Sequence, residues 1–197
     1  MKSVSMESAS MESASMKSAS MKSARNANAN EILPGLWLGN KGASQDQAWL
    51  QSKQISVIFN CTKDLPFVNT SMSLYRIPLD DNLEPSEIRN LEHWSWETVY
   101  KLMAEQKKGN KILVHCFAGM QRSAAVIAIY LVAMFRCTTA EAIAFIKQRR
   151  PIAFHSNANF YNSIKGFEDG FRDMISKTES FQKYRKIPLP IDRISNS

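Results

Sequence analysis

Residues 114–123 have the sequence Val-His-Cys-Phe-Ala-Gly-Met-Gln-Arg-Ser, and the rest of the chain is arranged around them. The apolar run 112–114 predicts a short buried strand before Cys116, and the almost entirely apolar run 124–135 predicts a buried helix after Ser123. Cys116 therefore follows a strand, the next five residues form a turn, and Arg122 begins a helix.

The turn between this strand and this helix is suited to an oxyanion. Its backbone N–H groups can point inward and form an anion cradle, and the helix adds the positive end of its dipole. Arg122 can bind two oxygens of a tetrahedral anion, and Gly119 supplies the backbone freedom that the turn needs. We therefore expect a phosphate ester, with a charge of about −1.5 to −2 near neutral pH, to bind at Phe117, Ala118, Gly119, Met120, Gln121 and Arg122.

Cys116 lies at the floor of this predicted cradle. The amides, the helix dipole and the arginine that favour phosphate also favour an ionised sulfur, which is a nucleophile directed at phosphorus. Ser123 can donate a hydrogen bond to that sulfur and help it to leave in a second step. His115 is expected to orient the loop through its ring nitrogens rather than to titrate.

These residues match the signature His-Cys-x5-Arg-Ser/Thr, and the chain resembles the dual specificity phosphatases of the cysteine-dependent phosphatase superfamily. Residues 32–39, Ile-Leu-Pro-Gly-Leu-Trp-Leu-Gly, are similar to the opening of that family's domain. The resemblance covers residues 31–175. It implies an α/β domain that hydrolyses phospho-Tyr and phospho-Ser/Thr through a phosphocysteine intermediate, with no cofactor and no metal.

The reaction also needs a carboxylic acid, because the leaving oxygen must be protonated and the nucleophile cannot do so. Residues 79–82, Leu-Asp-Asp-Asn, follow a predicted strand, and the carboxyl ends of parallel strands share one edge of a sheet. The resemblance implies Asp81 as the acid, since the family's acid follows an Ile-Pro pattern. Asp80 is the alternative, and both aspartates could instead only solvate a turn.

Three further positions have candidate roles. Residues 154–160 are similar to the family's Pro-Asn-x-x-Phe stretch, which implies that Asn157 braces the phosphate loop, although an N-cap cluster for the next helix is an equal alternative. Gln121 replaces the small residue that is commoner in the family. Cys61 could form a reversible disulfide with Cys116 on oxidation, but a buried structural cysteine is the usual case.

Periodicity and turn residues predict alternating strands and helices in the rest of the domain. A strand pair is expected within 32–40, strands at 55–60 and 74–78, and helices at 86–106, 138–150 and 159–175, with a shorter helix that ends at Lys53. Ser44 with Gln47 and Thr138 with Glu141 are candidate capping boxes. This order predicts a single α/β domain with a mostly parallel central sheet flanked by helices.

The two ends of the chain differ from the domain at 31–175. Residues 1–30, which begin with a Met/Ser-rich five-residue repeat, are expected to be disordered, and residues 176–197 form a basic tail. The ends carry four basic and two acidic, and five basic and two acidic residues, so most of the net charge of +7 lies outside the domain. We therefore expect no nucleic-acid partner.

Cysteine usage and hydropathy indicate in which cellular compartment the protein works. The three cysteines make no disulfide framework, and no Cys/His spacing is typical of zinc. No run approaches the roughly 20 apolar residues of a transmembrane helix, and the N-terminus lacks an apolar signal core. We expect a cytoplasmic protein, with the nucleus also open, and no membrane partner; the oligomeric state is not indicated.

The loop side chains favour one substrate class over others. Phe117, Met120 and Gln121 are uncharged, whereas a phosphoinositide or an RNA 5′-triphosphate would be better bound by lysine or histidine. We therefore expect phosphoprotein substrates. The alternatives are an RNA 5′-triphosphatase or phosphoinositide phosphatase of the same fold, and a non-catalytic phospho-binding protein.

Overall fold

The computed structural model describes residues 27–68, 71–177 and 189. In chain order the strands are β1 (Ala29–Leu33), β2 (Leu36–Gly39), β3 (Ile55–Asn60), β4 (Ser73–Arg76) and β5 (Lys111–His115). The helices are α2 (Lys41–Gln45), α3 (Gln47–Ser52), α4 (Pro85–Lys107), α5 (Arg122–Phe135), α6 (Thr139–Arg149) and α7 (Tyr161–Ser176). The predicted strand pair and the predicted longer helices are confirmed. β1 begins two residues before the predicted domain start, and most of both chain ends lies outside the described residues.

The strands form one sheet in the order β1-β2-β5-β3-β4. β1 and β2 are antiparallel around the Pro-Gly turn, and the other three pairings are parallel. This arrangement confirms the expected mostly parallel sheet. β5 occupies the centre of the sheet, so the loop that follows it opens at the middle of the sheet edge where the parallel strands end.

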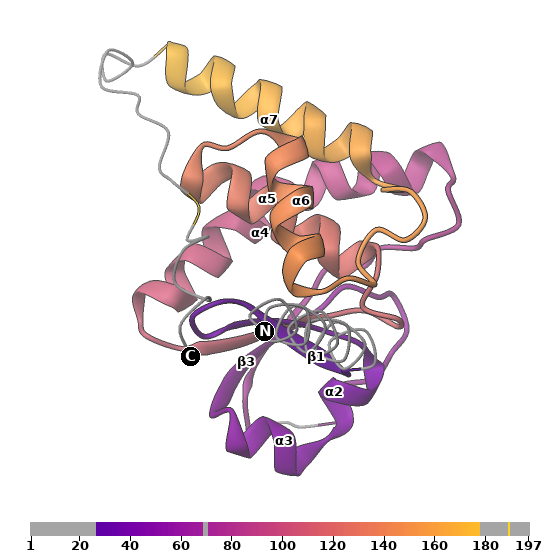
Figure 1. Ribbon diagram of the computed structural model, residues 1–197, viewed down its shortest axis with the longest axis vertical. Helices are drawn as coiled ribbons and strands as arrows, with labels where there is room; N and C mark the ends of the chain where they lie inside the picture. Colours follow the sequence, from indigo (N-terminus) through magenta and orange to yellow (C-terminus); the bar gives the residue numbers. More distant parts are fainter. Residues whose placement is uncertain (1–26, 69–70, 178–188, 190–197) are drawn as a thin grey trace, which may run out of the picture.

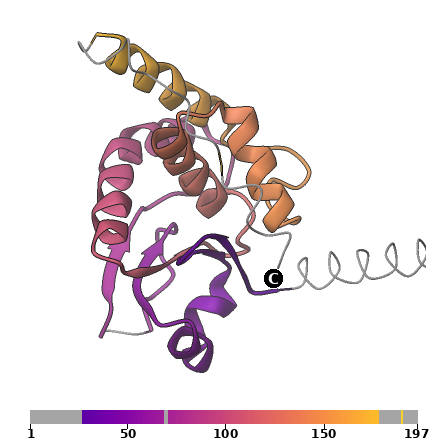
Figure 2. The same ribbon diagram turned by 60° about the vertical axis from the view of Figure 1, so that its left-hand side comes forward.

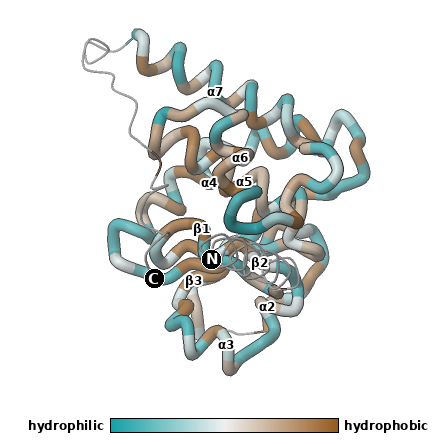
Figure 3. Tube along the Cα trace, in the orientation of Figure 1, coloured by the Kyte–Doolittle hydropathy of each residue, from teal (hydrophilic) through white to brown (hydrophobic). Residues whose placement is uncertain are grey.

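Helices cover both faces of the sheet. Helices α4 to α7 lie on one face, and the short helices α2 and α3 lie on the other, as two views of the ribbon show (Figure 1, Figure 2). The strands alternate accordingly: Ile112 and Val114 belong to the larger core under α5, and Leu113 belongs to a smaller core against α2 and α3. In the hydropathy colouring, hydrophobic residues are concentrated around β1 and β3, where the sheet faces the helices (Figure 3).

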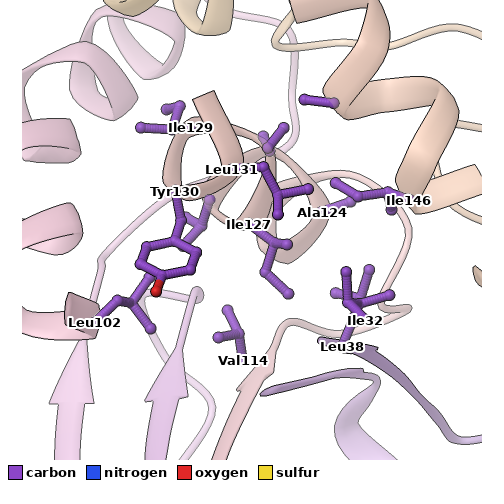
Figure 4. Close-up of a cluster of buried hydrophobic side chains, with 14 of the residues drawn as sticks. Ile32, Leu38, Leu102, Val114, Ala124, Ile127, Ile129, Tyr130, Leu131 and Ile146 are labelled. Atoms are coloured by element: carbon purple, nitrogen blue, oxygen red, sulfur yellow. The ribbon is translucent and has the colours of Figure 1, made fainter. Parts of the chain in front are cut away.

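Helix α5 is the centre of the larger core. Every residue from Ser123 to Val132 is buried, as expected for a helix that is apolar on all sides. Ile127 and Leu131 point toward side chains from the sheet, while Tyr130 lies beside Leu102 of α4 (Figure 4). This packing holds the first turn of α5, and therefore Arg122, in a fixed position relative to β5.

One of the two predicted capping boxes is wrong. Thr138 and Glu141 form a complete capping box at the start of α6, as predicted. Ser44, however, lies inside α2, because Asn40 caps that helix four residues earlier by accepting a hydrogen bond from the N–H of Ala43. Asp46 then caps α3 through the N–H of Trp49. Two short helices replace the single one expected.

Candidate active site

The loop from Cys116 to Gln121 connects the end of β5 to the start of α5. Two hydrogen bonds converge on the sulfur of Cys116: the N–H of Gly119 and the hydroxyl of Ser123 both donate to Sγ at 3.2 Å. Both groups lie where they would stabilise a negative sulfur. The structure thus places Ser123 against the sulfur, where the sequence led us to expect it.

Gly119 is required by both its backbone angle and its surroundings. Its φ is +66°, in the left-handed region that favours glycine, and a Cβ at this position would lie 2.5 Å from the carbonyl oxygen of Gly39. The end of β2 therefore packs directly against the turn of the phosphate loop.

A pocket of about 410 Å³ opens above Cys116. Its walls come from the phosphate loop, from the loop before α4 and from the segment before α7; the lining residues are Asp81, Leu83, Cys116, Ala118, Met120, Gln121, Arg122, His155, Ser156, Asn157 and Asn159. A potential nucleophile, a carboxyl group and a guanidinium therefore share one cavity. The predicted loop residue Phe117 instead lines a neighbouring cavity of about 470 Å³.

Arg122 stands between these two cavities and lines both. Its Nη1 donates to the carbonyl oxygen of Leu79 at 3.4 Å, whereas its buried Nε has no hydrogen-bond partner among the described residues. A buried guanidinium N–H without a partner loses free energy unless an anion or water meets it. Because Arg122 lines the pocket, its guanidinium lies where an oxyanion bound there could accept hydrogen bonds from it.

The structure separates the two candidate acids. Asp81 lines the pocket with Cys116, and Asp80 lines the neighbouring cavity. The side chain of Asp80 stabilises the loop, because its Oδ1 accepts a hydrogen bond from the N–H of Asp81 at 2.7 Å. Buried Glu87 of α4 accepts in turn from the N–H of Asp80 at 2.9 Å, and a hydrogen bond from Lys63 is the main reason that the pKa of Glu87 is lowered.

Sequence reasoning missed the residue that holds the carboxyl group of Asp81. The side-chain amide of Asn159 donates to Asp81 Oδ1 at 2.7 Å, across 78 positions of the chain. The only local signal was an additional asparagine two positions after Asn157.

The expected role of Asn157 is not the one that the structure gives it. The side chain of Asn157 is exposed, and the brace runs in the other direction: Gln121 Nε2 donates to the carbonyl oxygens of Asn157 and His155 at 2.7 and 3.2 Å. The alternative of an N-cap cluster is also wrong, because Phe160 is the N-cap of α7 and no side chain caps it.

Arg150 was also missed. It is 1% exposed, and its Nε donates to the carbonyl oxygen of Gly119 at 2.7 Å from behind the loop. Its Nη1 donates to Asn30 Oδ1 at 2.7 Å and to the carbonyl oxygen of Ala27 at 3.1 Å. Burial lowers the pKa of Arg150 to about 10, and the charge of Cys116 opposes this shift. A buried cation thus lies beneath the turn that would hold phosphate.

His115 does not charge near neutral pH. Burial lowers its pKa to about 4, which agrees with the expectation that it does not titrate in catalysis. Its Nδ1 is buried and has no hydrogen-bond partner among residues 27–68, 71–177 and 189. The expected bracing of the loop through the ring nitrogens is therefore not seen at Nδ1.

Cys61 lies at the end of β3, beside the end of β5, and its N–H donates to the carbonyl oxygen of His115 at 2.8 Å. Burial, followed by the charge of Cys116, raises the pKa of the Cys61 thiol well above its usual value. Cys61, Cys116 and Cys137 are all free thiols. The redox disulfide between Cys61 and Cys116 stays a hypothesis.

The part of the chain that the structure describes holds no group of three or more His, Cys, Asp or Glu side chains that could bind a metal ion. No helix within it has the length and apolar character needed to cross a membrane.

Comparisons with known proteins agree with one another. The sequence model of the dual specificity phosphatase catalytic domain matches residues 36–170. Dual specificity protein phosphatase 2 of Homo sapiens is 32% identical over 139 residues, which are 70% of this chain and 43% of that protein. Its Mus musculus counterpart is 33% identical over 123 residues, 62% of this chain and 37% of that protein. The chain thus spans less than half the length of these curated relatives.

Solved structures show the same fold. The crystal structure of human DUSP28 superposes with a TM-score of 0.65 at 24% identity and covers 74% of this chain and 96% of that one. The human tyrosine phosphatase-like serine/threonine/tyrosine-interacting protein has a TM-score of 0.63 at 26% identity, over 73% of this chain and 97% of that one.

Proposed function

The chain belongs to the dual specificity phosphatase family, and from this premise we propose that it hydrolyses phospho-Tyr and phospho-Ser/Thr in proteins through a phosphocysteine intermediate. The observation that supports this most is that Cys116, Arg122 and Asp81 line one pocket of about 410 Å³. A nucleophile, an anion-binding cation and a proton carrier are the three groups that such a reaction requires.

In the first step, Cys116 Sγ attacks phosphorus, and the bond from phosphorus to the ester oxygen breaks. Asp81 gives its proton to that leaving oxygen, so the product departs as a neutral alcohol or phenol. The backbone N–H groups of the loop and the guanidinium of Arg122 bind the non-bridging oxygens, where negative charge concentrates during transfer. We propose that these groups supply the positive charge and that no metal takes part.

In the second step, water attacks the phosphocysteine, and the bond between sulfur and phosphorus breaks. Asp81, now a carboxylate, takes a proton from the water, which restores its starting state. The sulfur leaves as a thiolate, which Ser123 stabilises by its hydrogen bond to Sγ at 3.2 Å. Inorganic phosphate is the second product.

The uncharged side chains of Phe117, Met120 and Gln121 support a single phosphate on a protein as the substrate, rather than a phosphoinositide or an RNA 5′-triphosphate. We further propose a cytoplasmic or nuclear location, because a reducing compartment keeps Cys116 a thiol. Phosphoproteins are the partners expected, and no nucleic acid or membrane is needed.

The experiment is hydrolysis of 4-nitrophenyl phosphate in the presence of a chelator by the wild type, Cys116→Ser and Cys137→Ser. We expect turnover by the wild type, none by Cys116→Ser, and near wild-type turnover by Cys137→Ser, which alters another buried cysteine. Equal turnover by the wild type and Cys116→Ser would contradict the mechanism, and phosphate binding without turnover by the wild type would favour a binding protein. A parallel assay of phosphopeptides, phosphoinositides and 5′-triphosphate RNA tests the substrate class.

A further inference from the structure

A series of hydrogen bonds joins the phosphate loop to the carboxyl group of Asp81 through two side chains. Gln121 belongs to the loop, and Asn159 precedes α7. The N–H of Asn159 donates to Gln121 Oε1 at 3.1 Å, and the side chain of Asn159 donates to Asp81 Oδ1 at 2.7 Å. Gln121 and Asn159 thus connect the phosphate loop to the loop that carries Asp81, although these two loops are far apart in the sequence.

Gln121 uses both ends of its side chain in this connection. Its Nε2 donates to the carbonyl oxygens of Asn157 and His155, while its Oε1 accepts from Asn159. Gln121 is buried, so these bonds are shielded from competing water. A small residue at this position could not reach the segment 155–159, which is why the glutamine matters here.

Asn159 links the hydrogen bonds of Gln121 to the carboxyl group of Asp81. The side chain of Asn159 is directed at Asp81 and does not cap α7, whose N-cap has no side-chain hydrogen bond. Because Asn159 donates to Oδ1, the other carboxyl oxygen of Asp81 is left to carry the proton into the pocket. The backbone of the loop that carries Asp81 is held separately, because the N–H of Asp80 donates a hydrogen bond to Glu87.

We propose that Gln121 and Asn159 are positioning residues that hold the general acid Asp81 above the phosphate loop before substrate binds. This inference rests on the proposed function, since it assigns no chemistry of its own. Asp81 faces Cys116, Arg122 and His155 across the pocket, and Asp80 lies next to it in the chain. Without the amide of Asn159, the carboxyl group is free to turn from the leaving oxygen toward the cation of Arg122.

The test uses the dependence of rate on the leaving group. The phenol of phosphotyrosine has a pKa of about 10, so its departure requires the acid, whereas 4-nitrophenolate is far less basic and leaves with little help. General acids contribute about 10²- to 10⁴-fold. We therefore expect Asn159→Ala to lower kcat/KM, which reports only the steps up to departure of the leaving group, by about 5- to 30-fold on phosphotyrosine and by less than about 3-fold on 4-nitrophenyl phosphate. Asn162→Ala, an exposed asparagine on α7, is the matched control and should change neither rate.

A double-mutant cycle separates positioning from general damage. In an Asp81→Asn background, Asn159→Ala should change the phosphotyrosine rate by less than about 2-fold, because the group that it positions is already lost. Gln121→Ala should reproduce the leaving-group dependence of Asn159→Ala, and the two losses should not multiply in the double variant.

The outcomes distinguish this inference from the proposed function. If the wild type is active and Cys116→Ser is inactive, but Asn159→Ala lowers both substrates equally or lowers the rate further in Asp81→Asn, the positioning role is wrong while the phosphatase stands. Circular dichroism and unfolding midpoints of each variant identify loss of folding. Should Asn159→Ala unfold, Asn159→Ser, which shortens the side chain without removing its polarity, must give the same leaving-group dependence or the inference fails.

Discussion

Arg150 Nε lies 2.7 Å from the carbonyl oxygen of Gly119, on the side of the phosphate loop that faces the protein interior. The same guanidinium bonds Ala27 and Asn30 at the start of the domain. It has no carboxylate among these partners, so its positive charge is balanced by carbonyl and amide oxygens and by the nearby sulfur. It therefore adds positive potential beneath the pocket while holding the loop carbonyls away from it.

Arg150→Met should destabilise the domain and impair the loop. Loss of several hydrogen bonds to a buried charged group predicts a decrease of about 2–4 kcal/mol in the free energy of unfolding. Urea unfolding measures this decrease, and Lys147→Met, an exposed change on α6, the helix that ends just before Arg150, is the control. Arg150→Lys keeps the charge but not the planar set of donors, so it should recover only part of the activity. Full activity in Arg150→Met would contradict this role.

Gly119→Ala should be more damaging than its backbone angle alone requires. Gly109 has a similar φ, +81°, but nothing lies within 4 Å of where its Cβ would be, whereas the Cβ at Gly119 meets Gly39 at 2.5 Å. Gly109→Ala reports the cost of the left-handed conformation, about 1–2 kcal/mol. We expect Gly119→Ala to exceed that cost in thermal unfolding and to lose most turnover; equal effects of the two changes would show that the packing against β2 is unimportant.

Ser123→Ala should slow the breakdown of the phosphocysteine more than its formation. A hydrogen bond to a charged group contributes about 1.5–3 kcal/mol, which corresponds to about 10- to 150-fold in rate. Rapid-mixing kinetics with 4-nitrophenyl phosphate should then show a burst of nitrophenolate followed by a slow steady state. Ser95→Ala, which removes another buried serine hydroxyl, should show no such change. A slower burst with unchanged breakdown would refute the assignment.

His115 makes the stability of the domain depend on pH. Burial, together with the charge of Arg76, lowers its pKa from 6.5 to about 4 in the folded state. The unfolded chain therefore binds the proton more readily between these values, so the contribution of His115 is complete above pH 6.5 and is lost as the pH falls toward 4. The free energy of unfolding should fall by about 2–4 kcal/mol across this range.

His115→Asn should remove most of this pH dependence. Urea unfolding at pH 7 and at pH 4.5 provides the comparison, and His93→Asn, on α4, is the control. If the free energy of unfolding of His115→Asn depends on pH as strongly as that of the wild type, other groups are responsible for this dependence.

The strand, the turn and the helix around Cys116 could be predicted because they are contiguous. Hydrophobic runs on both sides fix the buried strand and helix, and the spacing from Cys116 to Arg122 is covalent. The same holds for the capping box of Thr138 and Glu141, whose partners are three positions apart. The error at Ser44 arose among short helices, where Asn40 and Asp46 offered competing caps.

The hydrogen bonds that hold the site in place join residues that are distant in the sequence, so local patterns do not predict them. Asn159 and Asp81 are 78 positions apart, and Arg150 and Gly119 are 31 positions apart. Strand order predicts which loops share an edge of the sheet, but no propensity or spacing specifies which side chains of those loops meet, because that depends on how α5 and α7 pack and on where β2 and β5 end. The primary sequence alone thus specified the chemistry of the loop, whereas the folded chain established which side chains hold the acid and the loop in place, since those contacts exist only after distant segments have packed.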